Sequence, residues 1–214
     1  MTRTATAVSL TVLLLIATLP ARAASTANGS FESDVLSADS YCISFAAPLC
    51  PTVTGWTGDF YVVNGAPGPI TPPMPLPDGS QFAMLQATNA MGQSVTIDVP
   101  GNYQLSWSDA GRAAYIGASG NESYDVSFDG SVLESFSTTT GSPWASHSLI
   151  FSAGAGVFTL EVAGTTPFGQ GDNSVLLDDF VLTFMPEPAN LALSSAALVV
   201  LAGRHGLVRR RSSH

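Results

Sequence analysis

The sequence predicts an all-β domain folded as a two-sheet sandwich. Between Ala24 and Met185, turn residues recur about every 8–12 positions, and apolar residues alternate with a period of two. The same stretch has no run with the 3.6-residue period of an amphipathic helix. We therefore expect about eight or more short strands, enough for two stacked sheets.

Residues 1–23 stand apart from this domain as a predicted signal peptide. Arg3 supplies a positive start, residues 5–19 form an apolar run, and small residues occupy positions −3 and −1 of a cut after Ala23. A second cut, after Ala27, stays open. The apolar run is short for a spanning helix of about 20 residues. We expect signal peptidase to remove it, leaving the domain exported.

The domain, residues 24–184, is strongly acidic. Arg112 is its one basic residue and lysine is absent from the chain, whereas fifteen carboxylates bring its formal net charge to −14. Such a surface repels phosphates, which excludes nucleic acid as a partner. The acidity is compatible with oxygen-ligand cation sites, but we favour the simpler explanation that it keeps an exported protein dispersed.

The two cysteines, Cys42 and Cys50, are predicted to form a disulfide. An exported domain folds in an oxidising compartment, where cysteines this close in sequence pair readily. We expect a small closed loop that stabilises the fold by about 2–3 kcal/mol.

Two hairpins are predicted. Residues 93–99 and 103–107 alternate apolar and polar on either side of a Pro-Gly-Asn turn. Residues 123–129 alternate likewise, end in an Asp-Gly turn, and are followed by a return strand over 131–136.

The remaining segments are less regular. A nearly continuous apolar run over 175–184 predicts a central strand covered on both faces. Residues 65–78 hold six prolines, which lack amide donors, so we expect a loop outside the sheet interior. Other short strands are expected near Phe31 and Trp56 and over residues 59–63, 81–85, 148–152 and 157–162.

Three short motifs in order resemble the galactose-binding-like jelly rolls found among carbohydrate-binding modules. They are Asn28-Gly-Ser-Phe-Glu32, then Gly55-Trp56, and finally Leu177-Asp-Asp-Phe-Val-Leu182. The resemblance spans the domain and implies a jelly-roll sandwich whose first and last strands are neighbours.

In that family the first and last strands often share a structural calcium. The resemblance therefore implies a calcium held by Glu32 with Asp178 or Asp179, a carboxylate set that suits this ion. On simple alternation Asp178 points inward with Phe180, and a buried carboxylate needs a cation or hydrogen-bond donors. The alternative is that backbone N–H groups at a strand end cap Asp178.

A sugar site needs an exposed aromatic ring flanked by polar side chains. Trp144 and Tyr115 are the candidates we favour as stacking residues, and Tyr61 and Phe168 also lie beside predicted loops. Arg112 must pair with an acid such as Asp109, or anchor an acidic sugar. Three further aromatic residues fit strand alternation and are predicted to be core: Trp56, Trp107 and Phe180.

No catalytic motif emerges from the sequence. His147 is the one imidazole of the domain, and neither a Gly-x-Ser-x-Gly elbow nor a His-Glu-x-x-His helix occurs. Nothing singles out a pair of carboxylates for glycoside hydrolysis. We expect no enzyme, and an exported hydrolase is the weakest alternative.

Residues 185–214 form a tail of a different kind. Pro186-Glu187-Pro188 precedes an apolar run over about 189–208, and Arg209, Arg210 and Arg211 follow it. The run predicts a short transmembrane segment, and the arginines place its end in the cytoplasm. The order resembles the PEP-CTERM sorting tail of exopolysaccharide-producing Gram-negative bacteria.

That resemblance implies recognition by an exosortase-type membrane enzyme near Pro186, after a pause in the inner membrane. An ordinary C-terminal anchor without processing is the alternative. We expect a non-enzymatic protein of the cell surface or extracellular matrix, with a domain that binds exopolysaccharide. A purely structural biofilm protein without sugar binding is the second hypothesis.

Overall fold

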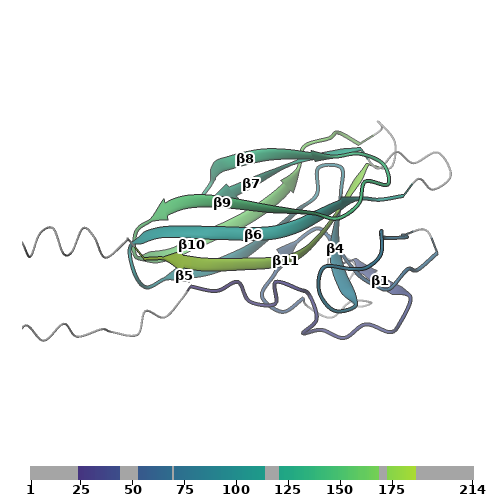
Figure 1. Cartoon of the computed structure of the whole chain (residues 1–214), viewed down its shortest axis with the longest axis horizontal. Helices are drawn as coiled ribbons and strands as arrows, with labels where there is room; N and C mark the ends of the chain where they lie inside the picture. Colours follow the sequence, from purple (N-terminus) through teal and green to yellow (C-terminus); the bar gives the residue numbers. More distant parts are fainter. Residues whose placement is uncertain (1–23, 44–52, 69, 114–120, 169–172, 187–214) are drawn as a thin grey trace, which may run out of the picture.

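The structure is a computed structural model that describes residues 24–43, 53–68, 70–113, 121–168 and 173–186. In these ranges eleven strands form two antiparallel sheets stacked as a sandwich (Figure 1). The strands are β1 (Ser40–Ile43), β2 (Thr57–Gly58), β3 (Tyr61–Asn64), β4 (Gln81–Gln86), β5 (Ala90–Ile97), β6 (Gly101–Gly111), β7 (Glu122–Phe128), β8 (Ser131–Thr138), β9 (Ala145–Ala153), β10 (Gly156–Gly164) and β11 (Ser174–Met185).

The six-stranded sheet has the order β1-β3-β4-β11-β6-β9, and the five-stranded sheet has the order β2-β5-β10-β7-β8. The predicted all-β, two-sheet jelly-roll sandwich is confirmed. From β8 onward consecutive strands alternate between the sheets, as in a jelly roll. None of the described residues belongs to a helix long and apolar enough to cross a membrane. The predicted signal peptide and transmembrane segment lie outside the described residues.

One predicted hairpin is confirmed and the other is wrong. β7 pairs with β8, and Asp129 and Gly130 between them have φ angles of 51° and 74°, as an Asp-Gly hairpin turn requires. β5 and β6, in contrast, belong to different sheets. The Pro-Gly connection between them therefore crosses the sandwich instead of folding one strand back on the other. Alternation shows which face of a strand is buried, but it does not name the neighbouring strand.

The main core lies between the two sheets. Trp56, Trp107 and Phe180 are all buried there, as predicted. Phe31 packs against Trp56 and Phe180 with ring centroids 5.5 and 6.4 Å apart. Phe31 was expected in a strand, but it lies in a turn with φ of 60°. Its ring joins the core without the backbone joining a sheet.

A second, smaller core lies on the outer face of the six-stranded sheet. The proline-rich segment covers this face: Ile70 packs with Phe82, Met84 and Leu176, and Leu76 and Trp144 lie at the margin. The predicted loop outside the sheet interior is confirmed. β11 is the fourth strand of its sheet, with Leu176 in the outer core and Leu177 in the main core. The strand is therefore covered on both faces, as its apolar run predicts.

A bulge in β11 changes the side-chain parity. The pairing of β11 with β6 shifts between Asp178 and Val181, and Asp179 has φ of 56°. Asp178 therefore shares the outer side with Leu176, while Phe180 points into the main core. The expected common orientation of Asp178 and Phe180 is wrong, because simple alternation takes no account of the extra residue.

Cys42 on β1 is disulfide-bonded. Its predicted partner, Cys50, lies outside the described residues.

Candidate functional site

The two ends of the sandwich differ in what they carry. At one end, on the left of Figure 1, β11 ends, and the first described residues start toward the same end. We call this the tail end, and its turns are short: residues 98–100, 129–130 and 154–155. The opposite end, the loop end, carries the longer connections between β6 and β7, β8 and β9, and β10 and β11.

A groove of about 430 Å³ opens at the loop end. Its lining consists of five hydroxyl side chains, two amides and one carboxylate. These are Ser123, Ser137, Thr138, Thr139 and Thr166, then Asn121 and Asn173, and finally Glu122. Phe168, two residues beyond Thr166, is 64% exposed. The end of the sandwich therefore combines polar donors and acceptors with the accessible ring of Phe168.

Glu122 is the carboxylate of the groove lining, and it connects two loops at this end. Its side chain is buried, and its carboxylate accepts hydrogen bonds from the backbone N–H groups of Ala87 and Thr166, both at 3.1 Å. Burial raises the pKa of Glu122 above its ordinary value, since a charged carboxylate loses its hydration there. The residue ties the β4–β5 turn to the β10–β11 connection.

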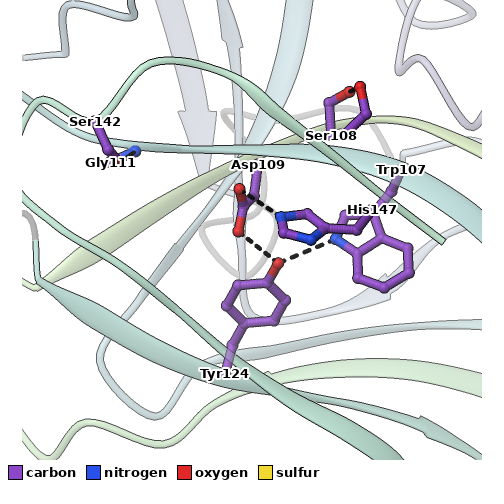
Figure 2. A network of polar contacts seen from close by, with 8 residues as sticks. Trp107, Ser108, Asp109, Gly111, Tyr124, Ser142 and His147 are labelled. Atoms are coloured by element: carbon purple, nitrogen blue, oxygen red, sulfur yellow. Dashed lines mark hydrogen bonds and ion pairs between the residues drawn. The ribbon is translucent and has the colours of Figure 1, made fainter. Parts of the chain in front are cut away.

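A buried polar network lies between the sheets at the same end (Figure 2). Asp109 on β6 is 4% exposed, and the Tyr124 hydroxyl donates to its Oδ2 at 2.7 Å. Trp107 Nε1 donates in turn to the Tyr124 hydroxyl at 3.0 Å. Burial, with the charge of Asp109 adding to it, raises the pKa of Tyr124 well above its ordinary value. The phenol therefore stays protonated and serves as a donor.

His147 on β9 completes the network. Its Nε2 lies 2.9 Å from Asp109 Oδ1, although the contact does not have the geometry of an aligned N–H···O hydrogen bond. The ring stacks on Trp107 at 5.4 Å and meets the edge of Phe136 at 4.9 Å. Within the described part of the chain, no hydroxyl or thiol bonds to His147 as a nucleophile would.

Asp109, the example given for an acid partner of Arg112, instead contacts His147 and Tyr124 through its two carboxylate oxygens. Arg112 is 5% exposed, and its Nη1 lies 3.5 Å from Ser174 Oγ. The burial of the guanidinium does not support the suggested role in holding an acidic sugar. Spacing along the chain favoured Asp109, but His147, 38 residues away, reaches Asp109 diagonally across the β6–β9 pair, in which it lies opposite Trp107.

Trp144, favoured as a sugar-stacking residue, is half-buried. Its indole N–H donates to the carbonyl of Pro73 at 2.8 Å, and its ring meets Phe82 at 6.0 Å. It fastens the proline-rich segment to the sheet. Tyr61 donates its hydroxyl to Gln86 at 3.2 Å, and Tyr115 lies outside the described residues. Among the aromatic candidates that the structure describes, Phe168 is the most exposed.

The loop end depends on one glycine that the sequence analysis missed. Gly111 donates its N–H to the carbonyl and hydroxyl oxygens of Ser142, at 3.2 and 2.9 Å. A Cβ at this position would collide with the carbonyl oxygen of Thr139, which belongs to the backbone and cannot swing away. A glycine near the end of a strand was the available signal, since such a glycine often marks close approach of another backbone.

The three predicted calcium ligands lie around one segment, residues 78–81. Glu32 Oε1 accepts hydrogen bonds from the N–H groups of Ser80, at 2.6 Å, and Gln81. Asp178 is fully buried, with Oδ2 accepting from the N–H of Asp78 at 3.2 Å and Oδ1 from that of Asp179 at 2.7 Å. Backbone capping of Asp178, the alternative to a cation, is therefore present.

Burial raises the pKa of Asp178 to about 8 and moves that of Asp179 in the same direction. Over the ranges that the structure covers, no three acidic, histidine or cysteine side chains gather as a metal site. Calcium binding stays a prediction, for which Glu32 and Asp178 would be the ligands.

No protein-family model matches the chain, and no curated protein matches it either. Solved structures do resemble it. A Stig cyclase, Fisc from Fischerella sp. TAU in complex with an indole compound, has a TM-score of 0.55 and 17% identity, covering 78% of this chain and 100% of that chain. An apo form cyclase from Fischerella sp. has a TM-score of 0.54 and 16% identity, covering 78% and 97%.

Carbohydrate-binding modules are also among the similar structures. CBM35 from Paenibacillus barcinonensis has a TM-score of 0.40 and 17% identity, covering 68% of this chain and 99% of that chain. At 17% and 16% identity, the two Fischerella structures show a shared fold and nothing about activity.

Proposed function

We propose that this chain is an exported, non-enzymatic protein of the cell surface or extracellular matrix, sorted through a PEP-CTERM tail and able to bind glycan at its loop end. The arrangement of the domain supports the first part. β11 ends at Met185, and Pro186, the first residue of the sorting motif, follows it directly. The tail end therefore provides attachment, and the loop end faces away from it.

The groove carries the proposal of glycan binding. Sugars are held by hydrogen bonds to their hydroxyls and by stacking on an aromatic face. The loop end offers both, with a lining of hydroxyls and amides and with Phe168 64% exposed nearby. Because the groove lining includes a single carboxylate, whose pKa is raised, it does not strongly repel an acidic polysaccharide.

The polar network at the loop end supports a non-enzymatic role. His147 is packed between the rings of Trp107 and Phe136, and Asp109 joins it to Tyr124, an arrangement that orders the end of the sandwich. The similarity to the Fischerella cyclases shows the fold, so we propose no cyclase activity. A purely structural matrix protein stays the second hypothesis.

Two measurements test the proposal. Residues 24–185 contain both core clusters, so this fragment is suited to a pull-down with exopolysaccharide and to a glycan array. Retention on at least one glycan supports binding, and retention on none favours the structural hypothesis. Mass spectrometry of the exported form tests sorting: we expect loss of the segment after Pro186, and an intact C-terminus through His214 contradicts processing.

A further inference from the structure

β9 is an exposed edge of the six-stranded sheet. It pairs with β6 on one side only, and its other side makes no backbone hydrogen bond to any residue in the described ranges. Unpaired N–H and C=O groups along a straight edge are a template for another strand. The edge is nine residues long, from Ala145 to Ala153.

The other sheet edges have features that discourage pairing with a further strand, and β9 lacks such features. β1 and β2 have four and two residues, while β8 carries Glu134 next to a bulge in its pairing with β7. β9 contains no proline, glycine, acid, lysine or arginine. His147, its one ionisable residue, points between the sheets against Trp107. Ile150 on the outer face is 64% exposed.

We propose that β9 pairs antiparallel with β9 of a second copy of this chain, centred on Leu149. In this register Ala145 faces Ala153 of the second copy, Ser146 faces Ser152, and Ser148 faces Ile150. His147 faces Phe151, and a twofold axis at Leu149 makes each of these pairs occur twice, so the edge is complementary to itself in this register.

Charge opposes contact between two copies over most of the domain but not at this edge. The domain has a formal net charge of −14, so copies repel each other over most of their surface. The proposed register places no charge opposite a like charge, because β9 carries no acid. Pairing would join two six-stranded sheets into one continuous sheet, which suits a matrix protein. The pairing itself does not depend on the proposed glycan binding or sorting.

Cysteine cross-linking tests the register. Because the two strands run antiparallel, the tail ends of the two copies lie at opposite ends of the dimer, and the C-terminal tails do not obstruct the pairing. The full chain, in detergent, can therefore be used. Chains carrying Ser146→Cys and Ser152→Cys, with different tags, are mixed and oxidised. We expect a disulfide-linked dimer containing both tags and little dimer from either variant alone, because each cysteine faces the other position. Absence of the mixed dimer, or equal cross-linking in each variant alone, overturns the proposal.

Sedimentation equilibrium of the uncross-linked chain gives an independent measurement. Ile150→Lys places two like charges close together across the twofold axis, and we expect dimerisation to weaken about tenfold or more. Val157→Lys is the matched control, because Val157 is 67% exposed but lies on β10, an inner strand of the other sheet. Its dimerisation should equal that of the unaltered chain. A chain that is monomeric at every concentration, or equal weakening in both variants, contradicts the pairing.

Discussion

The loop end and the tail end of the sandwich use the same strands for different purposes. At the tail end the turns are short and exposed, and side-chain contacts such as Ser152 to Asn102 lie at the surface. At the loop end Glu122 and Asp109 are buried and bonded across elements far apart in sequence. The buried polar groups of the domain therefore lie mainly at the end where hydrogen bonds hold the longer connections in place.

The largest effect is expected from breaking the network at the loop end. Asp109→Ala leaves Tyr124 and His147 without their shared partner and opens a cavity, so we expect a loss of about 3 kcal/mol or more in the free energy of unfolding. Asn102→Ala at the tail end is the control, with an expected change below about 0.5 kcal/mol. Urea denaturation measures both. Equal losses of unfolding free energy in the two variants would contradict the conclusion that the buried network stabilises the loop end more than surface contacts stabilise the tail end.

A second prediction concerns Asp178, which lies in β11 between the two ends. Its pKa of about 8 exceeds the unfolded value, so the folded state holds the proton more tightly. Its stabilising contribution is complete below about pH 4 and is lost as pH rises to about 8. With chelator present, we expect the stability of the unaltered chain relative to Asp178→Asn to fall progressively as pH rises across that window.

Calcium reverses this expectation. An ion held by Glu32 and Asp178 stabilises the ionised carboxylate, so melting near pH 8 would occur at a higher temperature with calcium than with chelator. An unchanged melting temperature contradicts the calcium prediction and leaves backbone capping as the role of Asp178.

A smaller effect is expected at Trp144, which joins the proline-rich segment to the sheet beside the loop end. Trp144→Ala removes the hydrogen bond to Pro73 and the contact with Phe82, and it should lower the free energy of unfolding by about 2 kcal/mol. Glycan retention by the folded variant should be unchanged. Loss of retention with unchanged stability would restore Trp144 as the sugar-stacking residue.

The sequence was sufficient for local structure but not for partners across the sandwich. Alternation located β7, the Asp-Gly pair identified the turn into β8, and a nearly continuous apolar run located β11. The predicted β5–β6 hairpin was wrong because a Pro-Gly turn is compatible either with a hairpin or with a crossing between sheets. The predicted orientation of Asp178 was wrong because the bulge depends on the φ of Asp179, which tertiary packing determines.

The candidate site was less predictable than the fold. Asp109, Tyr124 and His147 come from three strands, and no spacing in the sequence brings them together. Arg112 and Trp144 were chosen as a rare charge and a loop aromatic, yet both are engaged within the fold. Phe168 differs from them only in exposure, which depends on the packing of its neighbours.

The most direct test of the account compares glycan retention by Phe168→Ala and Val157→Ala in the fragment 24–185. Both residues are exposed, at 64% and 67%, so neither change should alter the free energy of unfolding appreciably. Val157 lies on β10 outside the groove. We expect Phe168→Ala to reduce retention on exopolysaccharide about tenfold, through loss of stacking, and Val157→Ala to leave it unchanged. Equal retention by the two variants, at the level of the unaltered fragment, contradicts a glycan site at the loop end.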